Sequence, residues 1–327
     1  MAVTRKDVAK MANVSVATVS YVINNTKNVT PEVRKRVLDA VEALNYHPNL
    51  LAKSLTTKET RHVAMLVDNL QNPHYGKLMK GVQQTAEREG YIVSLLSTAY
   101  STKEAMRELV SRGVDGVILA LSGYIIRDFS NLNLPTVYET SSLQTSYRQA
   151  IFDMVKYFQE QGHTRIAFLS GLPLTDTPHV RYHDFVNAMH YYHLDIYEEL
   201  IIDGTGTTDE EAGYQAVSRL LEQTTDFTAL FAVNDLMAIG ALKRLWEAGL
   251  RVPEDISVVG CDGISCSAYT IPPLSTIQTH SFQLGEALML QLISKIHPER
   301  GLSQTKQIIQ AEFVKRESVG KARVIKT

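Results

Sequence analysis

Cysteine is scarce in this sequence, and the marks of an exported or membrane-bound protein are missing. Cys261 and Cys266 are the only cysteines in 327 residues, and their spacing fits neither a zinc ligand pair nor a redox CxxC motif. The N-terminus lacks the apolar core of a signal peptide, and no apolar run is long enough to cross a bilayer. Lipidation signals, low-complexity tracts and short tandem repeats are also absent. We therefore expect a reduced, cytoplasmic protein.

The motifs of common enzymes are missing as well. Gly204-Thr205-Gly206 lacks the third glycine of a dinucleotide fingerprint, and the acidic run at 209–211 that follows would repel a pyrophosphate. No GxSxG, P-loop or HExxH motif is present. We expect neither an enzyme nor a cofactor. A cytoplasmic sugar- or nucleotide-binding enzyme stays as an alternative, and a solitary binding protein would need an export signal.

Positive charge is concentrated at the N-terminal end of the chain. Residues 1–59 contain nine Lys or Arg against five Asp or Glu, a net charge of +4, whereas residues 60–327 contain 24 against 30, a net charge of −6. A basic head on an acidic body predicts that only the head approaches a polyanion. A solvated helical surface could carry the same excess. The length allows two or three domains, each with its own core.

Residues 4–24 show the pattern of two short helices joined by a tight turn. Thr4 with Asp7 three residues later is typical of a helix start, and Asn13 tolerates the left-handed conformation that ends a helix. Ser15 can cap the second helix. The side chains of Val16, Ala17 and Tyr21 project outward from this helix. Those of Val19, Val22 and Ile23 can pack against the first helix. Such a helix fits the major groove of DNA, although a generic helical hairpin has the same spacing.

A third helix and a short linker follow. Thr30-Pro31-Glu32 has the N-cap, the proline and the early acid of a helix start. Apolar residues then recur at intervals of three and four, so one face can close on the first two helices: Val33, Val37, Val41 and Leu44. After Pro48 only six or seven residues favour a helix, which would be marginal alone in water. The sequence therefore predicts a linker whose helix forms when something stabilises it.

From Arg61 onward, apolar strand-like runs alternate with helical patterns. The series begins with HVAMLVDN, GKLMKGVQQTAEREG and YIVSLLST, and it restarts after Gly162 with RIAFLSG, GYQAVSRLLEQ, ALFAVND and ISVVGCDG. This alternation predicts parallel sheets covered by helices. Two similar α/β halves imply a cleft outside the carboxyl ends of the strands, where ligands collect.

The N-terminal segment resembles a known family. DVAKMANVSVATVSYVIN, followed by NVTPEVRKRVLDAVEALNYHPNLLAKSL, is similar to the head of the lactose-repressor and galactose-repressor (LacI) family of bacterial transcription regulators. The similarity runs through the whole chain. It implies a sequence-specific repressor of pseudo-palindromic operator DNA, controlled by a small molecule. No leucine-heptad tail follows AEFVKRES, which favours a homodimer over a tetramer.

The resemblance also implies the domain plan. Residues 1–59 would form an all-α helix-turn-helix head with a hinge helix at about 49–56. Residues 60–327 would form an α/β core of two lobes, like that of periplasmic sugar-binding proteins, with parallel sheets. Lobe 1 would span about 61–160 and 280–310, and lobe 2 about 161–279 and 311–327. A ligand that prefers one placement of the lobes would shift the population and so pair or separate the hinge helices.

Family resemblance assigns roles to residues of the head. Bases would be read by Val16, Ala17 and Tyr21; phosphates would lie near Thr4, Ser15, Thr18, Ser20 and Asn24; and the hinge would contribute Asn49, Ala52 and Leu55. The Leu55 side chain would wedge into the minor groove and bend the DNA, although packing against the core is the alternative. Tyr21 stands where arginine is common, so we expect an operator that departs from the usual half-site.

The same resemblance assigns an effector site to the cleft, formed by Asn72, His74, Tyr75, Thr140, Arg181, Thr208, Asn234 and Asp262. Such polar ends suit a sugar or sugar phosphate, because each can form two hydrogen bonds to neighbouring hydroxyls. Asn234 and Asp262 follow strands and should point into the cleft. Asp235 also maps to this site, with capping of the next helix as the alternative.

Several residues depart from the family pattern. Thr208 stands where relatives often place an aromatic ring, Glu139-Thr140 replaces an ending in Asp, and Asp-Asn-x-x-Gly is missing near Tyr147-Arg148. The pocket would then accept a different small molecule, or the main signal would be a phosphocarrier protein acting as corepressor.

Four histidines, His179, His183, His190 and His193, fall in a narrow sector if one helix carries them. His183 and His190 would lie about 10 Å apart along the axis, too far for one ion, so we expect no metal site.

Overall fold

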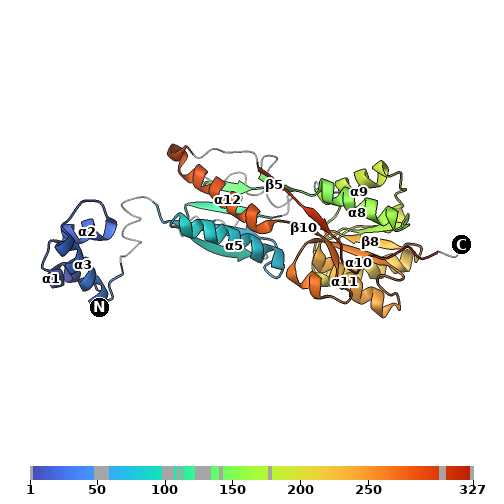
Figure 1. Ribbon diagram of the computed structural model, residues 1–327, viewed down its shortest axis with the longest axis horizontal. Helices are drawn as coiled ribbons and strands as arrows, with labels where there is room; N and C mark the ends of the chain where they lie inside the picture. Colours follow the sequence, from blue (N-terminus) through green and yellow to red (C-terminus); the bar gives the residue numbers. More distant parts are fainter. Residues whose placement is uncertain are drawn as a thin grey trace. The chain divides into compact units, whose positions relative to one another are not determined.

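The chain folds into two compact units, Met1–Thr60 and Arg61–Thr327 (Figure 1). The computed structural model describes residues 3–47, 59–97, 107, 109, 111, 113–121, 134–139, 143–175, 179–301 and 307–324. The expected hinge helix at about 49–56 lies outside these residues. No helix among the residues so described is long and apolar enough to cross a membrane.

The N-terminal unit is a bundle of three helices: α1 (Arg5–Ala12), α2 (Val16–Asn24) and α3 (Pro31–Ala43). The Asp7 carboxylate accepts hydrogen bonds from the backbone N–H and the hydroxyl of Thr4, at 2.8 and 2.6 Å. Asn13 ends α1 with a φ of 50°, and the Ser15 hydroxyl accepts from the N–H of Thr18 at 3.0 Å. The buried core contains Val8, Ala9, Ala12, Val19, Val22, Val37, Ala40 and Tyr46. The predicted caps and packing faces are thus confirmed.

The first lobe of the larger unit is built on a parallel sheet of order β2-β1-β3-β4. Its strands are β1 (His62–Val67), β2 (Ile92–Ser97), β3 (Gly116–Ala120) and β4 (Thr136–Tyr138). Helices α5 (Pro73–Arg88) and α12 (Ser281–Ile296) lie side by side on one face (Figure 1). Gly81 lets them approach closely, because a Cβ there would lie 2.0 Å from the carbonyl oxygen of Phe282.

The second lobe is built on a six-stranded sheet of order β12-β10-β9-β8-β6-β7. Its strands are β6 (Ile166–Leu169), β7 (Ile201–Ile202), β8 (Ala229–Ala232), β9 (Ser257–Asp262), β10 (Ser275–Gln278) and β12 (Glu312–Val314), the last antiparallel to β10. Helices α8 (Arg148–Glu160) and α9 (Val180–Tyr191) cover one face; α10 (Glu210–Gln223) and α11 (Asp235–Glu247) cover the other (Figure 1). The predicted two-lobed α/β core is confirmed. Short 3₁₀ turns occupy Glu198–Leu200, Ser265–Tyr269 and Pro298–Arg300.

The chain crosses between the lobes three times. Strands β5 (Leu143–Ser146) and β11 (Gln307–Gln310) pair in parallel, and Leu143 and Ile309 belong to the first-lobe core. The crossings therefore run from β5 to α8, from β10 to α12 and from β11 to β12.

One expected lobe boundary is corrected by the packing of α8. We expected lobe 1 to reach residue 160, but Ile151, Met154 and Phe158 are buried in the same core as Phe168 and Phe231 of the second sheet. The first crossing therefore precedes α8, near Tyr147.

Candidate functional site

The face of helix α2 that points away from the core of the head carries both polar and apolar side chains. Val16 and Ala17 are exposed and Tyr21 is half-buried, whereas Val19 and Val22 are buried. The structure thus turns the three expected base-reading residues outward. The residues expected near phosphates are all exposed or half-buried: Thr4, Ser15, Thr18, Ser20 and Asn24.

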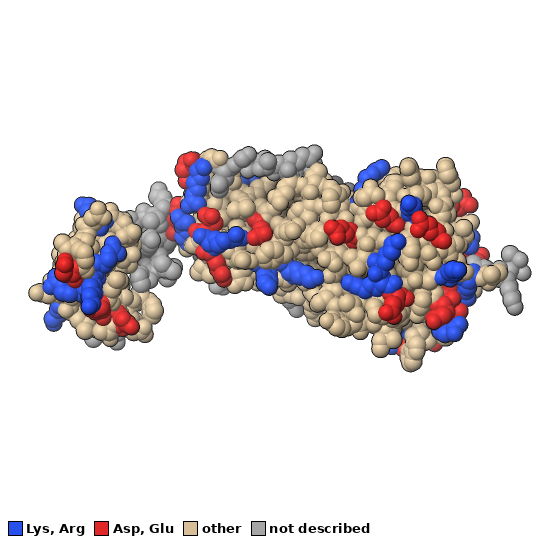
Figure 2. Space-filling model, viewed as in Figure 1, with Lys and Arg blue, Asp and Glu red and all other residues tan. Residues whose placement is uncertain are grey.

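Local hydrogen bonds fix the polar side chains of α2. The hydroxyls of Ser15 and Thr18 lie 2.8 Å apart, and the Asn24 amide donates to the Ser20 hydroxyl at 3.1 Å. The ammonium of Lys27 lies 4.7 Å from the centre of the Tyr21 ring, a contact that the sequence did not predict. Figure 2 shows more lysine and arginine than acidic side chains on the visible face of the head. This surface has the shape and charge to approach a polyanion.

Four of the expected site residues fall outside the described part of the chain. They are Asn49, Ala52 and Leu55 of the hinge and Thr140 of the cleft. Their roles stay predictions.

A cavity of about 390 Å³ lies between the two lobes of the larger unit. The first lobe contributes Asn72, His74 and Tyr75, from the start of α5. The second lobe contributes Arg181 from α9, Thr208, Asn234 and Asp262. Seven of the nine residues expected in the cleft therefore line one cavity; Thr140 lies outside the described residues, and Asp235 is considered below.

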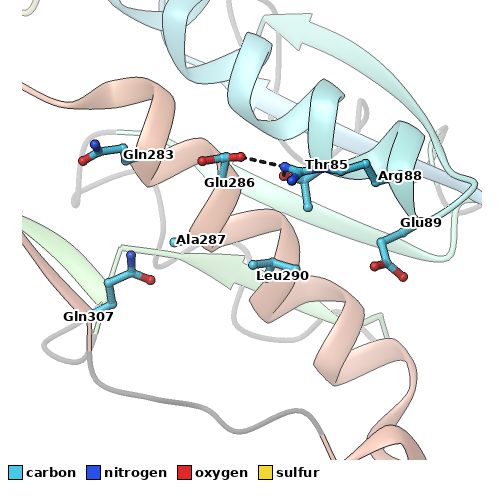
Figure 3. Close-up of a pocket in the computed structure, with 8 residues that line it drawn as sticks. All are labelled: Thr85, Arg88, Glu89, Gln283, Glu286, Ala287, Leu290 and Gln307. Atoms are coloured by element: carbon cyan, nitrogen blue, oxygen red, sulfur yellow. Dashed lines mark hydrogen bonds and ion pairs between the residues drawn. The ribbon is translucent and has the colours of Figure 1, made fainter.

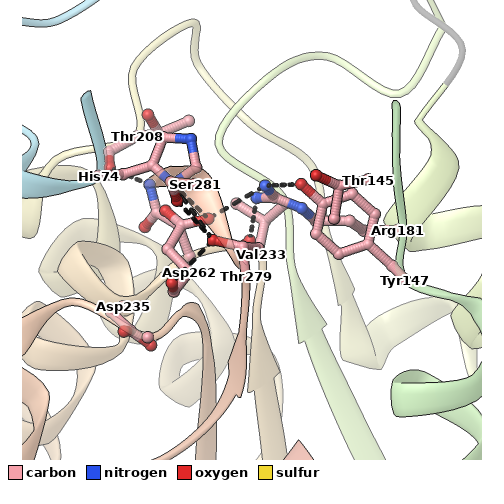
Figure 4. A network of polar contacts seen from close by, with 12 residues as sticks. His74, Thr145, Tyr147, Arg181, Thr208, Val233, Asp235, Asp262, Thr279 and Ser281 are labelled. Atoms are coloured by element: carbon pink, nitrogen blue, oxygen red, sulfur yellow. Dashed lines mark hydrogen bonds and ion pairs between the residues drawn. The ribbon is translucent and has the colours of Figure 1, made fainter. Parts of the chain in front are cut away.

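Arg181 is the centre of a polar network in this cavity (Figure 4). Its Nη2 donates to Oδ1 of Asp262 at 3.1 Å and to the hydroxyl of Tyr147 at 3.0 Å, and its Nη1 donates to the carbonyl of Val233 at 2.6 Å. Its guanidinium carbon lies 4.6 Å from the centre of the Tyr147 ring. Although burial disfavours the charge, neighbouring groups including Tyr147 and Asp262 hold the pKa of Arg181 well above its ordinary value. The guanidinium is therefore a fixed positive group.

His74 and Tyr75 form the first-lobe side of the cavity. Nδ1 of His74 lies 3.1 Å from the Ser281 hydroxyl and 3.9 Å from Oδ1 of Asp262. The Tyr75 hydroxyl donates to Oδ2 of Asp68 at 3.5 Å, and burial raises the pKa of that phenol well above its ordinary value. Both lobes thus meet at Asp262.

Asn72 and Asn234 line the cavity and also cap the N-termini of helices. The Asn72 side-chain oxygen accepts from the N–H of His74 at 2.9 Å, which caps α5. Asn234 accepts from the N–H of Met237 and donates to the carbonyl of Thr208, both at 2.8 Å. Their side chains are therefore held in place before any ligand arrives.

Asp235 does not belong to the cavity. Its side chain is fully buried, where Oδ1 accepts from the Thr276 hydroxyl at 2.6 Å and Oδ2 accepts from the N–H of Ile264 at 2.8 Å. Burial, with the nearby Asp262 charge, raises the pKa of Asp235 to about 7. The expected effector contact is wrong here. The alternative, capping of the next helix by Asp235, is wrong as well, because the side chain that caps α11 is that of Asn234, whereas Asp235 ties α11 to β10 and to the N–H of Ile264.

Sequence reasoning missed several lining residues: Asp68, Glu139, Gln144, Thr145, Tyr147, Ser170 and His179. Asp68 and Ser170 directly follow β1 and β6, so the rule that identified Asn234 would have found them. Glu139 accepts from the N–H of Thr145 at 3.0 Å, a contact that no local sequence pattern predicts.

The expected absence of a metal site rested on the histidines. His179 lies in the cavity, with Nε2 2.7 Å from the carbonyl of Pro173. In the ranges that the structure describes, no group of three or more His, Cys, Asp or Glu side chains is placed to hold a metal ion.

A second hollow of about 310 Å³ lies between α5 and α12 (Figure 3). Nη2 of Arg88 lies 2.6 Å from Oε1 of Glu286 across this hollow. Both partners are partly exposed, so this hollow has the character of an open surface groove.

Comparison with known proteins agrees with the two kinds of domain. Residues 4–49 match the model of bacterial regulatory proteins of the lacI family, and residues 155–319 match a periplasmic binding protein-like domain. The HTH-type transcriptional repressor PurR of Pasteurella multocida is 34% identical over 333 residues, covering 97% of this chain and 98% of that protein. PurR of Mannheimia succiniciproducens is 33% identical, covering 97% and 99%.

Solved structures of lacI-family regulators have the same fold. The lac repressor dimer bound to operator and the anti-inducer ONPF superposes with a TM-score of 0.84 at 27% identity, covering 98% of this chain and 100% of that one. The complex of the transcriptional regulator CelR with cellobiose superposes with a TM-score of 0.69 at 26% identity, covering 97% and 99%. With a helix-turn-helix head, a two-lobed core and relatives that span its length, this chain belongs to the lacI family of DNA-binding transcriptional repressors.

Proposed function

We propose that a small polar molecule bound between the lobes controls how tightly this repressor holds its operator. The observation that carries this proposal is the network of Arg181, Asp262 and Tyr147 inside a cavity of about 390 Å³. Groups from both lobes line it, so a ligand there has a different affinity for each relative placement of the lobes. That difference is what a population shift needs.

The charges of the cavity narrow the ligand class. Three carboxylates, Asp68, Glu139 and Asp262, line it with a single guanidinium, Arg181. That guanidinium already binds three protein groups. An excess of negative acceptors favours a ligand rich in O–H or N–H donors and disfavours a phosphate. We therefore favour a neutral donor-rich compound, such as a sugar derivative or a nucleobase, over a sugar phosphate. The similar regulator CelR was solved with cellobiose, whereas the relatives that are 34% identical over nearly the whole chain are PurR repressors.

The head would bind a pseudo-palindromic operator as part of a cytoplasmic homodimer. Val16, Ala17 and Tyr21 would face base edges in the major groove, and Leu55 with Ala52 would enter the minor groove. The methyl groups of Val16 and Ala17 suit contact with thymine methyls. Thr4, Ser15, Thr18, Ser20 and Asn24 would lie near phosphates, and Asn49 would contact DNA from the hinge.

A phosphocarrier protein acting as corepressor is the second candidate. It is favoured by the cleft residues that depart from the family pattern, Thr208 above all, which offers no aromatic ring against a sugar face. No observation favours the other alternative, a cytoplasmic sugar- or nucleotide-binding enzyme.

The test is a salt titration of binding to palindromic DNA selected from a random library. It is run with neutral sugars, amino sugars, nucleosides and their phosphorylated forms. We expect specific binding that one neutral or amino compound changes at least tenfold, with a smaller effect of its phosphorylated form. Specific binding that no compound changes would favour the protein corepressor, and an absence of specific binding would overturn the whole proposal.

A further inference from the structure

One direct hydrogen bond joins the first helix of lobe 1 to the corner that carries Asp262. Nζ of Lys77, on α5, donates to the carbonyl oxygen of Gly263 at 2.6 Å. Gly263 directly follows Asp262, whose carboxylate lines the ligand cavity and binds Arg181. A charged side chain of one lobe thus holds the backbone of the other lobe next to the ligand site.

The corner at Asp262 and Gly263 is a rigid part of lobe 2. Asp262 has a φ of 111°, which a non-glycine residue keeps only where its surroundings enforce it. Its carbonyl accepts from the N–H and the hydroxyl of Thr279, at 3.3 and 3.0 Å. The N–H of Gly263 donates to the hydroxyl of Thr276 at 3.3 Å, and the N–H of Ile264 donates to Asp235 at 2.8 Å. A displacement of the corner therefore moves it as one piece.

The space at Gly263 is also restricted. Its φ is 66°, and a Cβ there would lie 2.8 Å from Cγ of Gln278, on β10. The carbonyl of Gly263 consequently keeps its direction toward α5. A rotation of one lobe relative to the other changes the distance from this carbonyl to Lys77, and a rotation larger than the flexible lysine stem can follow breaks the bond.

We propose that Lys77 is a positioning residue that sets the balance between lobe placements in the absence of ligand. It rests on the proposed function above, because it acts on the corner that the ligand would contact through Asp262. A ligand in the cavity and Lys77 on α5 then both contact the same rigid segment, the corner at Asp262 and Gly263. Lobe 1 follows the DNA-binding head in the chain, so we expect a change in its placement to alter operator binding.

The direction of the effect follows from the comparison with known structures. The chain is similar in fold to a lac repressor captured on its operator. We therefore expect the described placement of the lobes to favour DNA, and the loss of Lys77 to weaken operator binding. A charge-assisted hydrogen bond of this kind corresponds to roughly a tenfold change in an equilibrium constant.

The test compares Lys77→Met with Lys77→Arg and Lys80→Met in the full chain. Lys80 lies on the same helix and its side chain is exposed, so Lys80→Met removes the same charge without touching the corner. Binding to the palindromic DNA selected by the wild-type protein is measured without any ligand, beside binding to random DNA. Hydrogen exchange of the first turn of α5 and of residues 263 and 264 gives a second readout.

We expect Lys77→Met to weaken specific binding about tenfold and to speed exchange at both segments, with Lys77→Arg near wild type and Lys80→Met unchanged. Equal behaviour of Lys77→Met and Lys80→Met would overturn the inference, as would tighter specific binding or an equal loss on random DNA. If Lys77→Met does not fold, Lys77→Gln, which keeps an N–H donor, replaces it and is expected between wild type and full loss. If the wild-type protein selects no DNA, the proposed function fails, which is a different result.

Discussion

Nη2 of Arg181 lies 3.1 Å from Oδ1 of Asp262, although the two side chains come from α9 and the end of β9 and are only 23% and 4% exposed. Two opposite charges removed from water in this way stabilise each other only while both are present. The pair is also the point where the cavity can offer a ligand hydroxyl both a donor and an acceptor.

Replacing Arg181 by Met should remove the response to ligand. The ratio of operator affinities with and without the active compound is expected to fall to about one. The unfolding free energy should fall by roughly 3 kcal/mol, because Asp262 is left buried without its partner. Urea unfolding measures the second effect.

The double variant Arg181→Met with Asp262→Asn is the control. It removes both charges, so it should recover part of the lost stability but none of the response. If the double variant lost as much unfolding free energy as the two single variants together, the two charges would not be coupled.

Replacing Tyr21 by Arg should change the preferred operator. Arginine donates two hydrogen bonds to the edge of guanine, whereas tyrosine offers one hydroxyl and a ring. Selection from random DNA is expected to show a gain of guanine at one position of each half-site, worth about 1–3 kcal/mol of discrimination. Lys35→Met, at an exposed position of α3, should leave the selected sequence as it is. An unchanged half-site in the Tyr21 variant would remove this residue from the base-reading set.

Much of this fold follows from local rules that a sequence displays. Val19 and Val22 are buried and Val16 and Ala17 exposed because a helix repeats every 3.6 residues. Asn234 and Asp262 line the cavity because they stand at the carboxyl ends of parallel strands. Such positions need no knowledge of distant partners.

The failures come from contacts that no local pattern encodes. The amphipathic pattern of α8 shows a buried face but does not say which of two sheets buries it, so the lobe boundary was placed thirteen residues too late. Asp235 follows Asn234, yet one step along a helix turns its side chain from the cavity toward Thr276 of β10. Glu139 and Tyr147 enter the site by the meeting of lobes, which only the tertiary structure shows.

Replacing Leu55 by Ala should weaken specific DNA binding more than nonspecific binding. The family resemblance places this leucine in the minor groove, where an apolar wedge is favourable only on DNA that bends at the operator centre. Affinities for the selected palindrome and for random DNA of equal length are compared at one salt concentration. Equal losses on both would favour the alternative, in which Leu55 packs against the core.

His163 should make the core less stable as the pH falls. Its ring is buried between Thr228 and the C-terminal segment: Nδ1 lies 2.9 Å from the Thr228 hydroxyl, and Nε2 lies 3.0 Å from the carbonyl of Gly320. That carbonyl can only accept, so Nε2 carries the proton and Nδ1 accepts from Thr228. Burial lowers the pKa of His163 from 6.5 to about 4.

The sign follows from proton binding. Between pH 4 and 6.5 the unfolded chain binds a proton at His163 that the folded chain excludes. The free energy of unfolding therefore falls by about 1.4 kcal/mol for each pH unit that the pH is lowered in this range. Asp235 acts in the opposite direction, because its pKa, raised to about 7, makes the folded state bind a proton above pH 3.8. The two effects offset each other in the wild-type protein. The variant His163→Asn should therefore be less stable at pH 7.5 but gain stability relative to wild type as the pH falls to 4.5. Urea unfolding at half-unit steps measures the difference, and parallel curves for the two proteins would contradict a neutral buried His163.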